Sequence, residues 1–524
     1  MNLIFKIILI QLIASSGFYF SKDDNTKLEK ENPPNIIYIL TDDLGYGDIS
    51  VFNLNGKIKT PNIDNLAKEG MMFTDAHTSS SVCTPTRYGI LTGRYNWRSN
   101  LKNGVLTGKS KALIPNSRTT IASMLKKQGY QTAFIGKWHL GWDWAIINKE
   151  DNSGEGWDAK DFDNIDFNKP VKNGPKELGF DYSYGHNGSL DMAPYVYVEN
   201  GNPTAIPTNN TENTGKYSWW RKGPTSPDFD HEDVTPYFFR KAINFVKEYA
   251  NKKSPFFLYL ALPSPHTPIL PTKEWQGKSE LNPYGDFVMM IDDYVGQLIT
   301  QVDRSGISKN TIIVFTSDNG CSPAVKIDEL TAKNHHPSYI YRGHKADIFE
   351  GGHRVPFIVK WPNNVVANSK SDQTICTTDF MATAAEISGY QLKDNEAEDS
   401  FNMLPLLNGS FTGNSFRKVT VHHSINGSFA IRKGDFKLIM CPDSGGWSFP
   451  NPEKDKVFIA GLPKMQLYNL KSDPGEQHNL INSYPEKVEE LKQLLNKTIV
   501  EGRSTRGVKQ QNDTGNSWKQ LWWM

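Results

Sequence analysis

The chain has 524 residues, of which 58 are lysine or arginine and 57 are aspartate or glutamate, so its formal net charge at pH 7 is only +1. This length suffices for one large α/β domain with a smaller partner and a substantial core. The balanced charge argues against a general nucleic-acid-binding protein, which needs a dominant basic field. An anionic ligand must therefore be captured by local basic residues.

The N-terminus has the order of segments that is typical of a cleaved secretory signal. A short apolar stretch from Ile7 to Ile13 follows Lys6, and small residues and then a charged segment come after it. The apolar run is too short to span a bilayer as a mature anchor. We therefore predict a signal peptide over residues 1–20 and a periplasmic or secreted protein. No cysteine follows the run and no later stretch is long enough to cross a bilayer, so we expect no stable membrane anchor.

Continuous apolar runs alternate with helical periodicity between residues 33 and 415. The predicted strands are Asn35–Leu40, Pro255–Leu262, Thr311–Thr316 and Val355–Lys360. The predicted helices are Ile63–Gly70, Thr120–Gly129, Tyr237–Ala250 and Tyr284–Ser305. Strands that are apolar along their whole length are buried on both faces, so the pattern predicts an α/β domain with a mostly parallel sheet and helices on both faces. Polar residues directly after such strands lie where these sheets bind ligands.

Two polar stretches, 142–173 and 200–230, are predicted to be surface loops. From about Phe416 the pattern changes to short strands separated by turn residues. These predicted strands are Val419–His422, Ser428–Arg432, Phe436–Met440 and Leu467–Leu470, and a helix over Pro485–Val500 follows them. We therefore predict a catalytic α/β domain over residues 33–415 and a smaller C-terminal α+β subdomain, an antiparallel sheet with a helix, over residues 416–524.

Residues 83–87 read Cys-Thr-Pro-Thr-Arg, and Leu-Thr-Gly-Arg follows at 91–94. Here the chain resembles the formylglycine-dependent (type I) sulfatases of the alkaline-phosphatase superfamily, in particular arylsulfatases and N-acetylgalactosamine-6-sulfatases. In that family Cys-x-Pro-x-Arg directs a maturation enzyme to oxidise the cysteine to an aldehyde, 3-oxoalanine or formylglycine. Taken alone, the five residues also fit a small buried thiol beside a proline turn. The resemblance implies an alkaline-phosphatase-like fold, sulfate ester hydrolysis and a formylglycine made from Cys83.

A formylglycine at position 83 has a clear chemical use. Its hydrate carries two geminal hydroxyls, of which one attacks sulfur to form a covalent sulfate ester. The other, once deprotonated, collapses to the aldehyde and expels sulfate, whereas a serine ester would depend on water attacking a hindered anion. If Cys83 is modified, Cys321, Cys376 and Cys441 remain, and they allow at most one internal disulfide.

Four acidic or amide side chains follow two of the predicted strands: Asp42, Asp43, Asp318 and Asn319. They offer only oxygen ligands, which suits a hard cation such as Ca²⁺ or Mg²⁺. Any one of them alone also fits a helix cap after a strand. Their Thr-Asp-Asp and Ser-Asp-Asn-Gly contexts match the metal set of the family, so the resemblance implies one Ca²⁺ with residue 83 as a further ligand. It also allows Asp318 to accept the proton of the attacking hydroxyl.

Cations and histidines stand in the order that the family shows. Lys137 and His139 lie in a Gly-Lys-Trp-His segment, and the resemblance implies that Lys137 holds a sulfate oxygen and that His139 takes the diol proton. His266 would protonate the leaving oxygen, with Lys345 as competitor; Lys345 would also bind sulfate, and Arg87 would brace residue 83. Single lysines and histidines are often only solvated or structural, so the joint occurrence carries the assignment.

Residues 184–195 resemble the corresponding stretch of sulfatases that act on 6-sulfated galactose or N-acetylgalactosamine. His186 and Asp191 are therefore candidate sugar contacts, although the stretch also fits a loop packed on the core. We expect a sulfated polysaccharide or its oligosaccharides as substrate. The alternative within the superfamily is a phosphodiesterase or phosphonate monoester hydrolase. A different class, a catalytically silent glycan-binding protein, applies if Cys83 stays unmodified.

Overall fold

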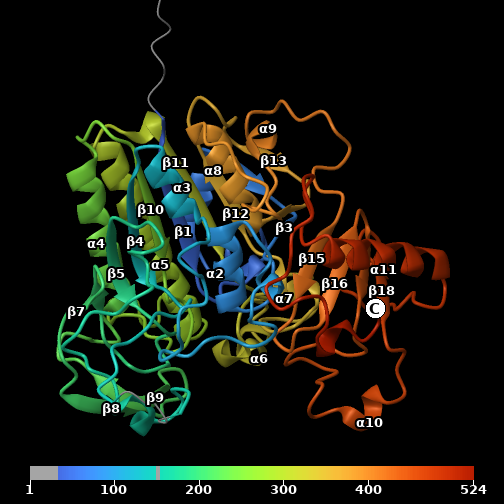
Figure 1. Cartoon of the computed structure of the whole chain (residues 1–524), viewed down its shortest axis with the longest axis horizontal. Helices are drawn as coiled ribbons and strands as arrows, with labels where there is room; N and C mark the ends of the chain where they lie inside the picture. The colour runs from blue at the N-terminus through green and yellow to red at the C-terminus, as the bar shows by residue number, and fades with distance from the viewer. Residues whose placement is uncertain (1–32, 149–153) are drawn as a thin grey trace, which may run out of the picture. The chain divides into compact units, whose positions relative to one another are not determined.

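A ten-stranded sheet runs through the computed structural model, which describes residues 33–148 and 154–524 (Figure 1). The predicted signal peptide, residues 1–20, lies outside the described residues. Across the sheet the strands are β13 (Ser369–Ser371), β2 (Met71–Phe73), β12 (Phe357–Lys360), β11 (Thr311–Ser317), β1 (Asn35–Thr41), β10 (Phe256–Ala261), β4 (Gln131–Lys137), β5 (Tyr182–His186), β6 (Val198–Glu199) and β7 (Asn202–Pro203).

The five neighbouring strands β11, β1, β10, β4 and β5 are parallel. Strand β12 is antiparallel to both β11 and β2. Every residue of β10 and β11 is buried, because helices cover both faces of the sheet. The predicted mostly parallel sheet and its four predicted strands are confirmed, whereas β4 was not predicted.

Two groups of helices pack on this sheet. In one group α5 contacts both α1 and α4, and in the other α2, α3 and α8 contact one another. The helices are α1 (Pro61–Lys68), α2 (Cys83–Thr92), α3 (Ile121–Lys127), α4 (Val234–Tyr249), α5 (Pro283–Arg304), α6 (Ile327–Thr331), α7 (Glu350–His353), α8 (Phe380–Ser388), α9 (Leu404–Leu407), α10 (Lys456–Ile459) and α11 (Pro485–Val500). All four predicted helices are present: the observed starts of α1 and α4 lie two and three residues from the predicted ones, and those of α3 and α5 lie one residue away.

Local sequence explains where two important helices begin and end. Helix α5 starts after Asn282, whose side chain accepts hydrogen bonds from the backbone N–H groups of Tyr284 and Gly285, with Pro283 at the first helical position. Helix α2 ends before Gly93, whose φ of 60° is the left-handed conformation that favours glycine at a helix end. The nucleophile candidate Cys83 is the first residue of α2, so the helix fixes its position.

The C-terminal part forms a second, four-stranded antiparallel sheet in the order β15 (Thr420–His423), β16 (Phe429–Lys433), β17 (Phe436–Ile439) and β18 (Gln466–Asn469). Helix α11 packs against β16 and β17. These elements confirm the predicted small antiparallel sheet with a helix. Its core also contains Tyr95 and Trp97, so the segment that follows α2 packs into the core of this second sheet. The proposed boundary at residues 415 and 416 stays a prediction.

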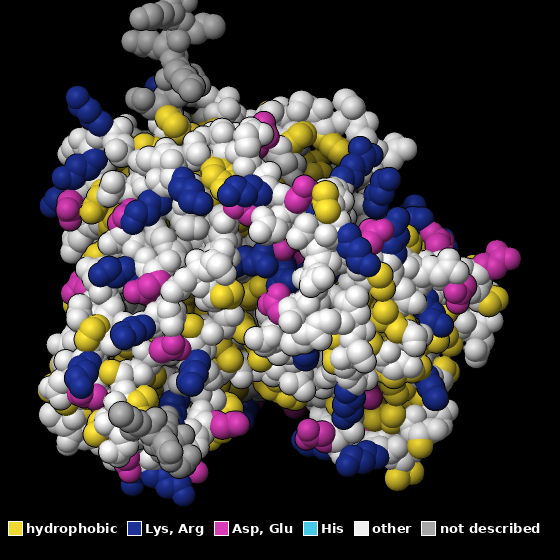
Figure 2. All heavy atoms as spheres, in the orientation of Figure 1, with side chains coloured by type: hydrophobic (Ala, Val, Ile, Leu, Met, Phe, Trp, Pro, Cys, Tyr) yellow, Lys and Arg dark blue, Asp and Glu magenta, His cyan; other side chains and the backbone are white. Residues whose placement is uncertain are grey.

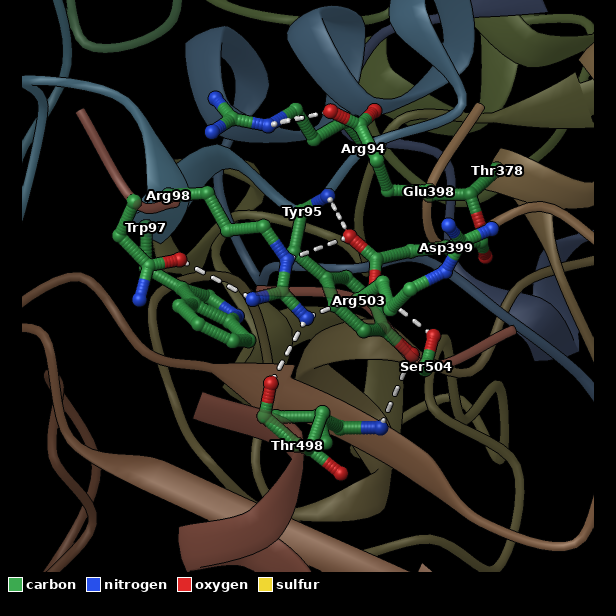
Figure 3. A network of polar contacts seen from close by, with 12 residues as sticks. Arg94, Tyr95, Trp97, Arg98, Thr378, Glu398, Asp399, Thr498, Arg503 and Ser504 are labelled. Atoms are coloured by element: carbon green, nitrogen blue, oxygen red, sulfur yellow. Dashed lines mark hydrogen bonds and ion pairs between the residues drawn. The ribbon is translucent and has the colours of Figure 1, made fainter. Parts of the chain in front are cut away.

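A buried polar network also joins the segment after α2 to the C-terminal part (Figure 3). Arg98 donates from Nε and Nη2 to the two carboxylate oxygens of Asp399, over 2.7 and 2.8 Å. The same guanidinium donates to the Thr498 carbonyl of α11 over 3.1 Å, and Ser504 Oγ donates to Asp399 over 2.7 Å. Because both ions are fully buried, each depends on the other for its charge to be tolerated.

The two predicted surface loops differ from expectation. The 200–230 stretch contains a hairpin of β8 (Asn209–Asn213) and β9 (Trp220–Thr225), and its alternation was hidden by polar residues on the exposed side. The 142–173 stretch buries Trp142 and Phe162, so it is not wholly on the surface. All four cysteines are free thiols. Among the helices of residues 33–148 and 154–524, none has both the length and the apolarity to cross a bilayer.

Candidate active site

The carboxyl ends of four neighbouring parallel strands bring the candidate residues together. Asp42 and Asp43 follow β1, Asp318 and Asn319 follow β11, Lys137 ends β4, and His266 lies just beyond β10. The register aligns these ends, since Thr41 pairs with Ser317 and Ala261 pairs with Gly136. The sheet edge therefore forms the site that the strand endings predicted.

Two of these residues have strained backbones. Asp43 has a φ of 65° and His139 a φ of 53°, both in the left-handed region that non-glycine residues seldom adopt. Such conformations persist where the surrounding structure determines them, and they cluster at functional sites. Here each conformation turns a chain segment sharply at the end of a buried strand.

Cys83 is buried and lines a cavity. Its Sγ is 3.6 Å from Asp42 Oδ1. Burial raises the pKa of the Cys83 thiol, and the Asp42 charge raises that pKa further. A thiolate is therefore disfavoured here, which argues against Cys83 acting as an ordinary cysteine nucleophile.

Arg87, one turn along α2, ties the strand ends to the helix that begins at Cys83. The buried guanidinium donates from Nε to Asp318 over 3.0 Å and from Nη2 to Asp42 over 3.2 Å. A third bond, from Nη1, reaches the backbone carbonyl of Lys137 over 2.9 Å. Arg87 thus joins the ends of β1, β11 and β4, which is the bracing position expected for it.

The oxygen-rich set Asp42, Asp43, Asp318 and Asn319 fits a hard divalent cation. All four side chains are buried, and Asp42, Asp43, Cys83 and His266 each place one ligand atom within 4.8 Å of the others. Asn319 donates from Nδ2 to Asp43 over 2.7 Å, while its buried Oδ1 has no hydrogen-bond partner. A buried carbonyl oxygen without a donor is a position that a metal ion can satisfy.

The charges of these carboxylates support the same conclusion. Burial and the nearby Asp42 charge raise the pKa of Asp318 to about 7. Burial alone would also raise the pKa of Asp42, but the charges of Lys137, His266 and Arg87 outweigh it and lower that pKa well below its usual range. Carboxylates crowded in this way are stabilised together by a bound dication.

Two buried lysines approach the same carboxylates. Lys137 donates from Nζ to Asp42, and Lys345 Nζ lies 2.8 Å from both carboxylate oxygens of Asp43. Although burial opposes it, the Asp43 charge raises the pKa of Lys345, so this lysine stays protonated. Lys345 also lines the cavity beside Cys83. The cavity base therefore carries fixed positive charge that suits an anionic ester.

The hydrogen bonds of His139 define which of its nitrogens carries the proton. Nε2 lies 2.7 Å from the carbonyl oxygen of Leu106, an acceptor only, so the proton is on Nε2. The buried Nδ1 has no partner and keeps its lone pair. Burial, with the charges of Lys137 and Arg87, lowers the pKa of His139 well below 6.5. His139 is therefore a neutral base that lines the same cavity as Cys83.

His266 presents the opposite ring nitrogen to the site. Its Nδ1 lies 2.5 Å from the Thr267 carbonyl and so carries a proton, while Nε2 lies 3.6 Å from Asp43. Burial and the Lys345 charge lower the pKa of His266. Both histidines line the cavity, so the structure brings together the two predicted proton carriers.

The cavity above Cys83 has a volume of about 400 Å³. One wall comes from residues before and within β9, including Trp219 and Arg221, and the opposite wall includes Trp447 from the C-terminal part. Figure 2 shows the molecular surface hollowed at its lower edge, between the part that holds β8 and β9 and the part that holds α10. The cavity would admit a sugar unit with its sulfate directed at the base.

The two candidate sugar contacts occupy different places. Asp191 lines the cavity, where it forms an ion pair with Arg221 over 2.5 Å. His186 is buried and stacks on Phe238, with ring centroids 5.9 Å apart, and it is not among the residues that line the cavity. The aromatic wall residues Trp157, Trp219 and Trp447 were not predicted, because they lie in segments without regular periodicity.

A second group of buried histidines consists of His77, His353 and His422. The rings of His353 and His422 stack with centroids 3.9 Å apart and planes 9° apart. Lys437 Nζ lies 3.0 Å from His353 Nε2. The positive charge of this adjacent ammonium disfavours a metal ion bound at that nitrogen.

Comparison with known proteins agrees with this arrangement. The family described as "Sulfatase" matches residues 34–390, and the family described as "N-sulphoglucosamine sulphohydrolase, C-terminal" matches residues 344–505. The chain is 32% identical to an N-acetylgalactosamine-6-O-sulfatase of Bacteroides thetaiotaomicron, over 90% of this chain and 95% of that protein. It is 31% identical to arylsulfatase A of Bos taurus, over 89% of this chain and 88% of that protein.

Solved structures match in the same way. One, from work on the metabolism of multiple glycosaminoglycans by Bacteroides thetaiotaomicron, has a TM-score of 0.76 and 31% identity, and covers 89% of this chain and 99% of that one. Another, solved in complex with k-i-k-neocarrahexaose, has a TM-score of 0.67 and 25% identity, and covers 91% of this chain and 95% of that one.

Proposed function

Because the chain belongs to the sulfatase family and is a sulfuric ester hydrolase, we propose that it removes sulfate esters from a sulfated polysaccharide or its oligosaccharides. The sulfated position would be the 6-hydroxyl of galactose or N-acetylgalactosamine. Relatives named N-acetylgalactosamine-6-sulfatase, in addition to arylsulfatases, support this substrate. Asp191, which lines the cavity, is the residue proposed to contact a sugar hydroxyl.

One observation supports the proposal above all: His139 and Cys83 line the same cavity. The His139 proton is on Nε2, where it binds the Leu106 carbonyl, so the Nδ1 lone pair is available. A neutral histidine base beside position 83 is what a hydroxyl nucleophile or a diol at that position needs.

We propose Ca²⁺ and formylglycine as the cofactors of this site. Asp42, Asp43, Asp318 and Asn319 would hold the ion, and Cys83 would be the residue that a formylglycine-generating enzyme modifies. When present, the ion supplies positive charge against the sulfate and the formylglycine supplies a nucleophilic oxygen. The unpartnered Asn319 Oδ1 and the crowded carboxylates support this donor set.

The chain's own residues divide the remaining tasks. Lys345 lines the cavity and Lys137 is buried behind it, and both would neutralise sulfate oxygens as charge develops on them, since ion pairs with Asp43 and Asp42 fix their ammonium groups. His139 accepts a proton at Nδ1. The Thr267 carbonyl holds the His266 proton at Nδ1, so His266 would donate to the leaving sugar oxygen from Nε2 only as the imidazolium, a form that the Asp43 charge favours. Arg87 keeps residue 83 in register with Asp42 and Asp318.

We also propose that the enzyme is exported. The apolar segment within residues 1–20 supports a cleaved signal peptide and a periplasmic or secreted location. Residues 33–415 would form the catalytic domain and residues 416–524 the C-terminal subdomain. The C-terminal part would complete the cavity wall with Trp447, which supports a structural contribution of this part to substrate binding.

The test uses full-length protein produced together with a formylglycine-generating enzyme. Its activity is measured on a panel of oligosaccharides sulfated at defined positions and on a matched aryl sulfate and aryl phosphodiester. We expect sulfate loss from the 6-position of galactose or N-acetylgalactosamine units. A clear preference for the phosphodiester would overturn sulfate ester hydrolysis, and loss from another position would overturn only the proposed regiochemistry.

A further inference from the structure

A second cavity adjoins the candidate active site and shares a wall with it. This cavity has a volume of about 640 Å³ and is lined by residues of the 157–160 turn and of strand β9 with the residues before it. Trp157, Trp219 and Arg221 line both this cavity and the one above Cys83. The two spaces are therefore neighbours on either side of the same three side chains.

The shared wall is an aromatic clamp, defined as Trp157, Arg221 and Trp219. The Arg221 guanidinium lies over both indole rings, 5.1 Å from the Trp157 centroid and 4.8 Å from the Trp219 centroid. Trp157 is 43% exposed and Trp219 is 38% exposed. Two large apolar rings kept partly open to solvent beside a cavity are typical of a ligand surface.

Contacts of Arg221 and of its neighbour Trp220 fix the position of the clamp. Arg221 Nη1 binds Asp191 over 2.5 Å, and the backbone N–H of Arg221 donates to the Asp191 carbonyl over 3.3 Å. The next residue, Trp220, stacks on His231 with centroids 4.0 Å apart. Asp191 Oδ1 is buried, has no hydrogen-bond partner and lies 4.0 Å from His266 Nδ1. One carboxylate therefore fixes Arg221 of the clamp and lies beside a histidine that lines the active-site cavity.

The second cavity places polar groups around the exposed rings of the clamp. Lys160, Lys222 and Glu212 line the second cavity, so both donors and acceptors surround the exposed rings. An aromatic face beside mixed polar groups suits a pyranose, which has an apolar C–H face and hydroxyls at its edge. Because cations and anions both line this cavity, its composition does not demand a second sulfate.

We propose that the aromatic clamp is a second sugar subsite, which binds the glycan unit linked to the sulfated unit. The inference rests on the proposed function, since the first unit must sit above Cys83. The shared wall of the two cavities supports this proposal, because a glycan chain that leaves the active-site cavity past Trp219 enters the second cavity directly. The enzyme would therefore favour an oligosaccharide over the single sulfated sugar.

The test compares the methyl glycoside of the 6-sulfated monosaccharide with oligosaccharides that contain it. In Trp219→Ala and Trp157→Ala, the ratio of kcat/KM for the oligosaccharide to kcat/KM for the monosaccharide should fall roughly 3- to 10-fold, the effect of one aromatic contact. Trp219→Phe should recover part of the ratio. Tyr484→Ala, an exposed aromatic outside both cavities, is the matched control.

A binding measurement makes the test independent of turnover. In Cys83→Ala protein, adding Trp219→Ala should weaken the Kd for the oligosaccharide by a similar factor. An unchanged ratio and an unchanged Kd in both tryptophan variants would overturn the subsite. Failure of the wild-type protein to release sulfate from any substrate would instead overturn the proposed function, while the Kd comparison would still decide the subsite.

Discussion

The side chain of Asn319 donates from Nδ2 to the carboxylate of Asp43 over 2.7 Å, and this bond fixes the orientation of the amide. The Oδ1 atom is consequently the free end, buried and without a hydrogen-bond donor. Beside the three carboxylates of Asp42, Asp43 and Asp318, this neutral oxygen limits the negative charge while it adds a donor atom. The pair explains why an amide and not a fourth carboxylate stands at position 319.

Replacing Asn319 should weaken metal binding. Asn319→Ala removes one oxygen ligand and the bond that orients Asp43, so we expect the Ca²⁺ concentration for half-maximal stabilisation to rise by at least about 10-fold. The measurement is the change in Tm as Ca²⁺ is added back after chelation. Asn53→Ala removes a buried amide with a single bond to a backbone carbonyl and serves as the control. Equal Ca²⁺ midpoints in wild type and Asn319→Ala would count against the site.

Loss of the His139 base should slow catalysis without preventing folding. We expect His139→Ala to lower kcat by about 10²- to 10⁴-fold, the usual contribution of a positioned base. His478→Ala is the control, because the His478 side chain is 82% exposed. Steady-state kinetics on an aryl sulfate gives the comparison. A kcat within about threefold of wild type would show that Nδ1 does not accept the proton, since general-base loss costs far more.

The buried ion pair of Arg98 and Asp399 should contribute far more to the free energy of unfolding than an exposed ion pair does. Arg98→Met leaves the Asp399 carboxylate buried without its partner, so we expect the free energy of unfolding to fall by about 3–5 kcal/mol. Arg240→Met breaks an ion pair with Asp233 whose side chains are 49% and 47% exposed, and should cost about 0–1 kcal/mol. Urea denaturation measures both. Similar losses in the two variants would contradict the network of Figure 3.

His231 should make stability depend on pH. Burial lowers its pKa to about 3, whereas the unfolded chain has a value near 6.5. As the pH falls below 6.5 the unfolded state binds a proton that the folded state does not, so the native protein loses stability down to about pH 3. His231→Phe removes this loss, and its cost should become smaller by about 2 kcal/mol at pH 5.0 than at pH 7.5.

The control for this comparison is Tyr195→Phe, which changes a ring 4.5 Å from His231. Its phenol does not titrate between pH 5.0 and 7.5, so its cost should be the same at both pH values. Urea denaturation of the wild type and both variants at the two pH values gives six free energies of unfolding. Their differences give the cost of each substitution at each pH. A His231→Phe cost that does not change with pH would show that the imidazole is protonated or exposed in the folded state.

The strand ends could be predicted from sequence because chemistry and periodicity coincide there. Runs that are apolar at every position end abruptly in Asp42 and in Asp318, and parallel strands bring such ends to one edge of a sheet. Strand direction could not be read in the same way. β12 is antiparallel, but a strand buried on both faces has the same apolar pattern in either direction.

Other parts of the site depend on tertiary contacts that carry no local pattern. Strand β4 was missed because Gln131 and Thr132 interrupt the apolar run, although its last residue, Lys137, was recognised from its motif. The aromatic clamp was missed because Trp157 and Trp219 are 62 positions apart in segments without periodicity. Only the fold brings both rings over Arg221.

Residue 83 is proposed to act as a formylglycine, and peptide mass spectrometry combined with measurements of specific activity tests this role. Protein produced with and without a formylglycine-generating enzyme gives preparations with different fractions of aldehyde in the peptide that contains Cys83. We expect sulfate release in proportion to the aldehyde fraction, and no sulfate release by Cys83→Ala. Full activity in protein whose Cys83 is an intact thiol would contradict it.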